Sequence, residues 1–382
     1  MFVCERCGNS DPRYIGIRNG KEYCRFCIGF KGEMVKSLKP KAGAVVMDLK
    51  YKLSKEQADI ARKVKENFLN GIDTLIDAVC GAGKTELIYE VIACALSQRK
   101  TVAFAVPRRD VVIELVPRIQ STFPHNSVVS VYGGHTSKLA GDIVVLTTHQ
   151  LYRYPHMFDL IILDEIDAFP FKDNELLIAM LRNASRGRII MMSATPSDEI
   201  VKEFSGDKHC ILHLDTRFHR KPIPVPKVII SFGFTKYYVL IRNLQRFCKE
   251  NKQVFVFCPT IDICEKVYSV ISKIVKEGNL VHSKKIDRSQ IIDDFKKGNY
   301  KYLVTTAVLE RGVTIKDLQV IIFGADHDLY NEHALIQISG RVGRKYDAPE
   351  GEVLFLADKT TVAIERTIST IKKKNESLQN ML

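Results

Sequence analysis

Short apolar runs alternate with stretches of helical length from Leu53 onward, and this rhythm constrains the fold more than any other feature. Continuous apolar runs separated by helices predict parallel sheets that are covered on both faces. In the first part of the chain we expect strands at 75–80, 101–107, 128–133, 142–148, 160–165 and 188–194. In the second part we expect strands at 254–259, 302–306, 320–325 and 353–357.

The stretch RFHRKPIPVPK at 217–227 separates the two series of strands. Its three prolines lie within five residues, which excludes a central strand and favours an extended connection. At 382 residues the chain is also too long for one compact core. We therefore predict an α/β protein with two parallel-sheet lobes that are joined by an extended linker.

The chain is basic, with 57 Lys and Arg against 44 Asp and Glu and a formal net charge of +13. An excess of this size favours a polyanionic partner, with nucleic acid ahead of an anionic membrane surface. A basic protein without such a partner is the alternative. No run approaches the roughly 18 apolar residues of a membrane span, and the N-terminus lacks the apolar core of a secretory signal. We expect a cytoplasmic protein, and docking at the inner face of the plasma membrane is compatible with this.

Four of the ten cysteines form two CxxC pairs, which are separated by sixteen residues. Two such turns can direct four thiolates to one point, which predicts a tetrahedral zinc site with no open position. The predicted ligands are Cys4, Cys7, Cys24 and Cys27. Residues 1 to about 40 contain too few apolar side chains to fold without a metal ion that links the cysteines. A redox CxxC and chance spacing are the alternatives, and the other six cysteines are expected to be reduced core residues.

Basic and aromatic residues are interleaved around the CxxC pairs, as in surfaces that hold phosphates and stack bases. The alternative is that Tyr23 and Phe26 form the small core of this module.

The hexapeptide CGAGKT at 80–85 follows the first apolar run and precedes a helical stretch. Strand, glycine-rich turn and helix are the context in which backbone N–H groups cradle phosphates. The residues predicted to hold the phosphates are Gly81, Ala82, Gly83, Lys84 and Thr85. Lys84 would reach the outer phosphates and the Thr85 hydroxyl would bind magnesium. An ordinary loop is the alternative, and Ala78 stands where the usual pattern begins with glycine.

An acidic pair ends another apolar run, LIILDEID. Asp164 can hold magnesium through water, and Glu165 can orient or deprotonate an attacking water. Carboxylates at strand ends are common, so the pair gains its meaning from the phosphate cradle. Asp167 is a weaker candidate, with a helix cap as the alternative.

These motifs resemble those of superfamily 2 helicases, and the resemblance covers most of residues 50–360. The similar segments, in order, are LSxxQ (53–57), CGAGKT, VPRRDVVIEL (106–115), TTHQL (147–151), LDEIDAF, MMSATP, VTTAVLERGVTI (304–315) and QISGRVGR (337–344). The resemblance implies an ATP- and Mg²⁺-dependent, nucleic-acid-stimulated ATPase whose two lobes are RecA-like. It also implies that Gln57 reads the adenine.

In the resemblance, Arg341 and Arg344 act as arginine fingers on the γ-phosphate, a role worth roughly 10³ to 10⁵ in rate. If both lie on one helix, their spacing of three places them on one face. Surface salt bridges are the alternative for either arginine alone. The resemblance implies that Gln337, Glu310 and Gly312 line the same cleft.

The resemblance also implies contacts with the backbone of a nucleic acid strand. The matching positions are Pro107, Arg108, Thr147, Thr148, Thr305 and Thr306. Hydroxyls and main-chain amides bind phosphates without reading sequence. Capping of strand ends is the alternative for Thr148 and Thr306.

Within superfamily 2, the four-cysteine module, the LSKEQ segment and the PRRDVVIEL segment together resemble the ComFA family of late competence ATPases. That family implies a single-stranded DNA translocase with zinc at its N-terminus, which helps DNA across the membrane with protein partners there. The primosomal restart helicases share the PRxDV segment but resemble this chain less. We predict a zinc domain at 1–45, a first lobe at 46–218 and a second lobe at 219–382.

Two other functions are weighed against DNA uptake. One is a general DNA repair, replication-restart or RNA helicase, which substrate preference would distinguish. The other is a zinc-tethered clamp in which ATP acts as a switch with little turnover. Intact Lys84, Glu165, Arg341 and Arg344 argue against the clamp.

Overall fold

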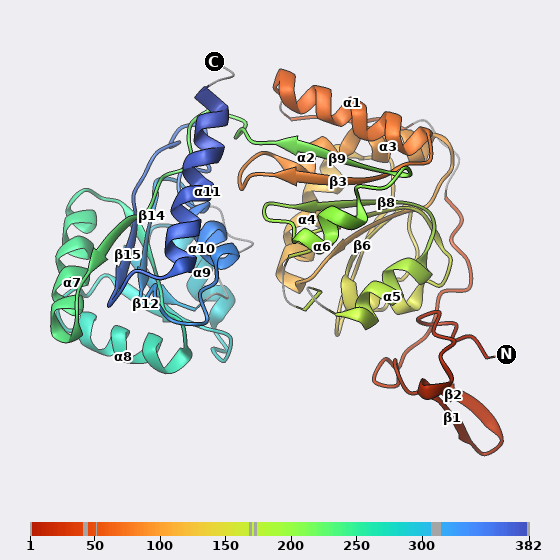
Figure 1. Cartoon of the computed structure of the whole chain (residues 1–382), viewed down its shortest axis with the longest axis horizontal. Helices are drawn as coiled ribbons and strands as arrows, with labels where there is room; N and C mark the ends of the chain where they lie inside the picture. The colour runs from red at the N-terminus through yellow and green to blue at the C-terminus, as the bar shows by residue number, and fades with distance from the viewer. Residues whose placement is uncertain are drawn as a thin grey trace. The chain divides into compact units, whose positions relative to one another are not determined.

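The computed structural model describes residues 2–40, 45–50, 52–167, 170–171, 174–306 and 315–379, with side chains up to Glu376. The chain divides into two compact units (Figure 1). One unit comprises residues 1–78 with 83–214, and the other comprises residues 215–382 with 79–82. Each contains one parallel sheet covered by helices, so the expected α/β fold with two RecA-like lobes is confirmed.

The sheet of the first lobe has seven strands in the order β5-β6-β4-β7-β8-β3-β9. The strands are β3 (Asp73–Ala78), β4 (Val102–Val106), β5 (Val128–Val131), β6 (Ile143–Thr147), β7 (Phe158–Asp164), β8 (Ser185–Ser193) and β9 (His209–Leu214). The helices are α1 (Lys55–Leu69), α2 (Lys84–Leu87), α3 (Tyr89–Ser97), α4 (Arg109–Thr122), α5 (Glu175–Ala184), α6 (Asp198–Glu203) and the 3-10 helix η2 (Thr148–Arg153).

The register of this sheet brings the ends of its strands together. Asp77 of β3 pairs with Ser193 of β8, and Asp164 of β7 pairs with Met192. Val106 of β4 pairs with Thr147 of β6. All these pairs are parallel, so the residues that follow each strand emerge at the same edge of the sheet.

The sheet of the second lobe has six strands in the order β10-β15-β14-β11-β13-β12, and every recorded pair is parallel. The strands are β10 (Lys227–Ile230), β11 (Gln253–Phe257), β12 (Gly278–Val281), β13 (Tyr302–Thr305), β14 (Leu318–Phe323) and β15 (Val353–Ala357). The helices are α7 (Gly233–Lys249), α8 (Ile261–Ile271), α9 (Arg288–Lys296), α10 (Glu332–Ser339) and α11 (Val362–Gln379).

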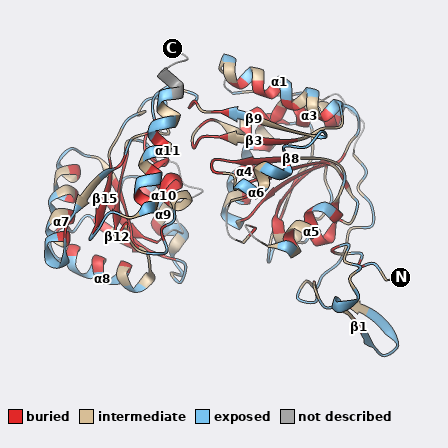
Figure 2. Ribbon diagram, viewed as in Figure 1, coloured by how far each residue is buried: buried red, intermediate tan, exposed pale blue. Residues whose placement is uncertain are grey.

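Alternate residues of β11 show how both faces of the second sheet are covered. Val254 and Val256 belong to the core under α7 and α8, whereas Phe255 and Phe257 belong to the core under α9, α10 and α11. All four side chains are fully buried. Much of the strand ribbon in this lobe is red in Figure 2, which marks buried residues. Burial of each stabilises the fold by about 1.5–3 kcal/mol, which explains the uninterrupted apolar run.

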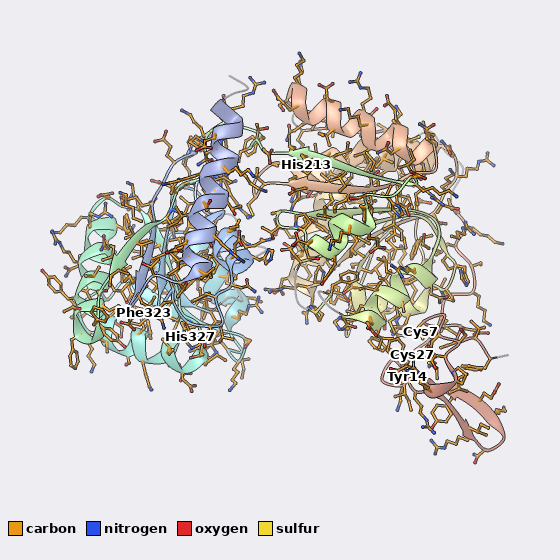
Figure 3. All side chains as sticks on the ribbon, in the orientation of Figure 1. Cys7, Tyr14, Cys27, His213, Phe323 and His327 are labelled. Atoms are coloured by element: carbon orange, nitrogen blue, oxygen red, sulfur yellow. The ribbon has the colours of Figure 1, made fainter. Side chains whose placement is uncertain are left out.

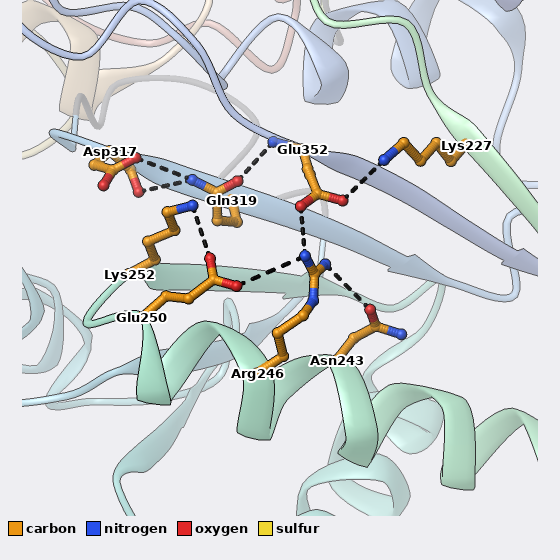
Figure 4. Close-up of polar contacts among 8 residues, drawn as sticks. All are labelled: Lys227, Asn243, Arg246, Glu250, Lys252, Asp317, Gln319 and Glu352. Carbon is orange, nitrogen blue, oxygen red and sulfur yellow. Dashed lines mark hydrogen bonds and ion pairs between the residues drawn. The ribbon is translucent and has the colours of Figure 1, made fainter.

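A polar network connects α7 to the strands of this sheet (Figure 4). Arg246 of α7 donates to Glu352 over 2.6 Å, and Lys227 of β10 lies 3.2 Å from the same carboxylate. Hydrogen bonding from Arg246, and then from Lys227, lowers the pKa of Glu352. The Glu352 N–H in turn donates to Gln319 of β14.

The N-terminal module is a short 3-10 helix, η1 (Pro12–Tyr14), followed by an antiparallel hairpin of β1 (Ile15–Arg18) and β2 (Lys21–Cys24). Asn19 and Gly20 form its turn with positive φ angles of 52° and 75°, as a two-residue hairpin requires. The rings of Tyr14 and Phe26 are 5.0 Å apart, so these aromatics contact each other within the module.

The expected strands all form, with ends that shift by up to three residues. The linker is extended at 221–226, whereas residues 217–220 form a turn that was not predicted. Three further strands of the two lobes, β9, β10 and β12, were not predicted. Each lies at an edge of its sheet. Edge strands carry polar residues and lack a long apolar run, so a search for apolar runs misses them.

Candidate active site and metal centre

The loop between β3 and α2 depends on two left-handed glycines. Gly81 has φ +85° and Gly83 has φ +77°, a conformation that side chains rarely adopt. A Cβ atom on Gly83 would also lie 2.5 Å from Nε2 of Gln57. Left-handed residues in a turn belong to the backbone pattern that makes anion-binding concavities. The loop therefore has the local structure that a phosphate cradle requires.

A lysine and a carboxylate meet beside this loop. Lys84 Nζ lies 3.7 Å from Asp164 Oδ1, and the two side chains are only 17% and 13% exposed. Thr85, which follows Lys84, is 8% exposed. Because β7 and β3 flank β8, their ends bring an ammonium, a hydroxyl and a carboxylate to one edge. Oxygen ligands of this kind suit Mg²⁺, so Thr85 and Asp164 fit the ion that ATP brings.

Glu165 follows β7 in a left-handed conformation with φ +58°. This region is unfavourable for a residue with a long side chain, and such strain gathers at functional sites. The Glu165 N–H donates to Asp164 Oδ1 over 2.8 Å. The backbone thus turns sharply between two carboxylates that are expected to have different roles.

Asp167 has a role that the sequence interpretation missed. Its Oδ1 accepts from the Ser193 hydroxyl over 2.8 Å, and its Oδ2 accepts from the Thr195 hydroxyl over 3.2 Å. Thr195 N–H also donates to Ser193 Oγ. The carboxylate therefore joins the end of β7 to the segment that ends β8. The two hydroxyls of the MMSATP segment were the signal for this contact.

Gln57 takes part in a capping box at the start of α1. Its Oε1 accepts from Ser54 N–H over 2.8 Å, and its own N–H donates to Ser54 Oγ. Such a box accounts for the LSxxQ spacing by itself. The side chain is buried, and its Nε2 faces Gly83 of the phosphate loop. The residue thus supports the loop as well as the helix.

The arrangement of Arg341 and Arg344 differs from the expectation of a shared helix face. Helix α10 ends at Ser339, and Gly343 between the arginines has φ +69°. Both residues therefore lie in a turn beyond the helix. Arg341 is 2% exposed, and Arg344 Nε donates to Gly340 O over 2.9 Å. Gln337 is on α10 and buried, whereas Glu310 and Gly312 lie outside the described residues.

Most of the residues that are expected to contact the nucleic acid strand are buried. Pro107 and the threonines at 147, 148, 305 and 306 are buried, and only Arg108, which precedes α4, is partly exposed. Thr305 Oγ1 donates to the Thr306 carbonyl, so that hydroxyl is already used. Thr147 makes no side-chain cap to η2. If these positions bind phosphates, main-chain amides are the available donors for most of them.

The four paired cysteines converge, and Figure 3 places Cys7 and Cys27 together in the N-terminal module. All four Sγ atoms lie within 4.8 Å of one another, and every side chain is buried. The distances are 3.4 Å between Cys4 and Cys27 and 3.8 Å between Cys7 and Cys24. A tetrahedral zinc with Zn–S bonds of about 2.3 Å requires sulfurs about 3.8 Å apart. The cluster therefore fits zinc.

Electrostatics of the cluster also favour a cation. The Cys27 thiol lowers the pKa of Cys4 by hydrogen bonding, while the same contact raises the pKa of Cys27. One thiolate thus opposes ionisation of its neighbour, and a divalent ion would remove this conflict.

The cysteine module is attached to the first lobe by contacts that the sequence did not suggest. Asn183 of α5 donates to Glu5 O over 2.7 Å, and Arg153 of η2 donates to Glu33 O over 2.8 Å. The Tyr152 hydroxyl donates to Lys31 O. The segment after the second CxxC is thereby held against η2, whose first residues are Thr148 and His149. Burial lowers the pKa of His149.

Within the described residues, no helix is both long and apolar enough to cross a membrane.

Comparisons with known proteins agree with this geometry. The DEAD/DEAH box helicase family matches residues 58–204, and the helicase conserved C-terminal domain matches residues 235–346. The competence protein ComFA of Bacillus subtilis is 33% identical over 98% of this chain and 86% of its own length. That of Streptococcus pneumoniae is 32% identical over 98% of this chain and 90% of its own length.

Solved structures show the same fold. S. cerevisiae Dbp5 bound to RNA and ADP BeF3 has a TM-score of 0.64 at 16% identity, over 85% of this chain and 92% of Dbp5. RecG bound to a three-way DNA junction has a TM-score of 0.62 at 20% identity, over 85% of this chain and 47% of RecG. Because the likeness to the two ComFA proteins extends over nearly the whole chain, the protein belongs to the ComFA family within the superfamily 2 helicases and is an ATP-hydrolysing, nucleic-acid-binding helicase.

Proposed function

We propose that the protein is a motor that uses ATP to translocate along single-stranded DNA and helps to draw transforming DNA into the cytoplasm during natural competence. The observation that carries the motor is the contact of Lys84 with Asp164 beside the two left-handed glycines. The competence role rests on the names of the two ComFA relatives.

The first lobe binds the nucleotide. Main-chain N–H groups of Gly81, Ala82 and Gly83 surround the phosphates, and Lys84 exchanges Asp164 for the outer phosphate oxygens. Thr85 and Asp164 would hold the magnesium ion, which would supply charge neutralisation at the phosphates. Gln57, next to Gly83, recognises the adenine. Gln57, Thr85 and Asp164 are buried and the Lys84 side chain is 17% exposed, which strengthens their electrostatic interactions with the phosphates.

Hydrolysis needs a base and a group that stabilises the developing charge. Glu165 orients the attacking water and accepts its proton. Arg341 and Arg344 act on the γ-phosphate, and Gln337 lines the same site. Asp167 connects the segment that bears Glu165 with Ser193 and Thr195, so a change at the nucleotide is transmitted to the chain that follows β8.

The single-stranded DNA binds through its phosphates to main-chain amides. These amides lie near Pro107, Arg108, Thr147, Thr148, Thr305 and Thr306. Zinc on the four cysteines keeps the N-terminal module folded, and its attachment to η2 places the module beside the TTHQL segment. We place the protein in the cytoplasm, peripheral at the inner face of the plasma membrane, with partners in the DNA-uptake machinery there.

The test is ATP hydrolysis with no nucleic acid, with single-stranded DNA, with duplex DNA and with RNA, at one salt concentration because phosphate-driven binding weakens with salt. Stimulation by single-stranded DNA above the others supports the proposal. Stimulation by RNA, or by duplex alone, contradicts the choice of strand and favours a repair or RNA helicase.

Variants test the site itself. Lys84→Ala and Glu165→Gln should abolish hydrolysis, whereas Lys63→Ala, which removes an exposed lysine from α1, should leave it unchanged. Hydrolysis near the wild-type rate in either of the first two would refute the assignment.

A further inference from the structure

The linker carries a buried arginine that no motif accounts for. Arg217 is only 2% exposed, although it lies three residues after the end of β9. Among the described residues, no carboxylate forms an ion pair with it. A buried guanidinium without a carboxylate is costly unless its N–H groups are all used, so its partners indicate its role.

Arg217 Nε donates to Cys80 O over 3.1 Å, and its other partners are carbonyls of the turn that follows α10. Its Nη1 donates to Val342 O over 2.8 Å and to Gly343 O over 3.0 Å, and its Nη2 approaches Gly340 O at 3.4 Å. The last carbonyls of a helix have no partner within the helix and attract cations. Arg217 thus stabilises the turn that contains Arg341.

His219, which follows Arg217 by two residues in the chain, contacts the same turn. Its Nε2 lies 2.7 Å from Gly343 O, and its Nδ1 accepts from Lys221 N–H. A carbonyl can only accept, so Nε2 bears the proton and the ring is neutral with both nitrogens used. Arg220, with φ +55°, donates its N–H to Arg217 O, which closes a turn that aims both side chains at Gly343.

Two observations link this contact to Arg344. Arg344 Nε donates to Gly340 O, the carbonyl that Arg217 Nη2 also approaches. Burial, followed by the charge of Arg344, lowers the pKa of Arg217 to about 10. Two guanidinium groups this close repel each other, and an anionic phosphate would relieve that repulsion.

The contact leaves little freedom at Gly343. A Cβ atom there would collide with Pro349 O and lie 3.1 Å from Arg217 Nη1. The turn is therefore held from both sides, and small displacements of it would move both finger arginines together.

We propose that Arg217, assisted by His219, is a positioning residue for nucleotide hydrolysis that fixes the 340–343 turn so that Arg341 and Arg344 reach the terminal phosphate. The inference rests on the proposed role of these two arginines. Misplacement of reacting groups by about 1 Å can lower a rate roughly 100-fold. Because arginine fingers act on the transition state, the loss should appear in kcat more than in nucleotide affinity.

The experiment measures kcat and KM for ATP with the nucleic acid that stimulates the wild type most, and the Kd of a fluorescent non-hydrolysable ATP analogue. Arg217→Lys should lower kcat about 10- to 100-fold with a change in Kd below about threefold. Lysine keeps the charge but lacks the planar fork of donors with which Arg217 reaches several carbonyls at once. The control Lys221→Ala removes an exposed cation from the same segment and should match the wild type.

A second pair of variants guards against misfolding of Arg217→Lys. His219 is only half-buried, so its replacements should fold. His219→Ala should lower kcat, and His219→Gln should restore it because its amide can donate to Gly343 O. Equal and wild-type kcat values in Arg217→Lys and His219→Ala would overturn the inference.

Arg344→Ala separates this inference from the proposed function. If Arg217 acts through the turn, Arg217→Lys should lower kcat by a smaller factor in an Arg344→Ala background than in the wild type, because only Arg341 is left for the turn to position. A further fall by the full factor would mean an independent role and overturn the inference alone. Wild-type hydrolysis in Arg344→Ala would refute the assigned arginine finger and the inference with it.

Discussion

The contact of Ser193 with Asp167 gives the most quantitative prediction. Ser193 is the last residue of β8 and is fully buried. Its hydroxyl donates to Asp167 Oδ1 over 2.8 Å and accepts from Thr195 N–H over 2.9 Å. Ser193→Ala removes both hydrogen bonds and leaves a buried N–H without that acceptor.

A hydrogen bond to a charged group contributes about 1.5–3 kcal/mol, and a buried unsatisfied group costs about 1–3 kcal/mol. Because the two effects share one hydroxyl, we expect Ser193→Ala to destabilise the first lobe by about 2–4 kcal/mol. With a urea m-value of about 2 kcal/mol/M, the unfolding midpoint of that lobe should fall by about 1–2 M. The two lobes are expected to unfold separately, so the transition of the first lobe must be followed on its own.

A double-mutant cycle with Asp167→Ala isolates the pair, and its coupling energy should be about 1.5–3 kcal/mol. Ser205→Ala is the control, because this exposed hydroxyl donates only to Val201 O within its own helical turn. It should shift stability by less than about 0.5 kcal/mol. A coupling energy below about 0.5 kcal/mol would refute a stabilising contact between Ser193 and Asp167.

Three other predictions concern the metal, pH and the second lobe. Replacing Cys24 and Cys27 with Ser should remove about one zinc per chain and make residues 2–40 sensitive to protease; unchanged metal content would contradict the site. Burial, then the charge of Arg217, lowers the His219 pKa below 6.5, so the neutral ring, whose Nδ1 accepts from Lys221 N–H, stabilises the second lobe above pH 6.5, and this contribution is lost as pH falls through the lowered pKa. The urea midpoint of that lobe should therefore fall more steeply on acidification in the wild type than in His219→Gln, and parallel pH profiles would count against this. Glu352→Gln should destabilise the second lobe by about 0.5–1 kcal/mol at neutral pH. Since Arg246 lowers the Glu352 pKa below 4.5, that difference should vanish as pH falls through the lowered pKa, and a difference in urea midpoint that is equal at both pH values would exclude the ion pair as its cause.

The sequence alone was enough for features whose physics is local. The left-handed backbone of the turn requires glycine at 81 and 83. The spacing of the two CxxC pairs lets four sulfurs converge on one point. The continuous apolar runs reflect burial of the strands on both faces of each sheet. The position of Asp164 at the end of an apolar run was enough to predict that it lies at the same edge of the sheet as the glycine-rich turn, since the carboxyl ends of parallel strands share an edge. Its contact with Lys84 comes from the structure.

Features that depend on strand neighbours were decided only by the tertiary structure. Asp167 meets Ser193 because β7 lies beside β8, an order that the sequence does not state. The end of α10 at Ser339 was hidden because the glycines at 340 and 343 could stand within a helix or after it. Edge strands such as β9 were not predicted because they lack a long apolar run.

Arg217 illustrates the same division. In the sequence it is one basic residue beside a proline-rich linker, and nothing local predicts its burial. Its partners are carbonyls more than 120 positions away, and main-chain carbonyls leave no trace in residue identity. The sequence by itself determined the two lobes, the glycine-rich turn at 80–85 and the cluster of four cysteines, because each depends on the conformational or chemical limits of its own residues. Only the tertiary structure decided which groups hold those residues in place, because that depends on contacts between segments that are distant in the chain.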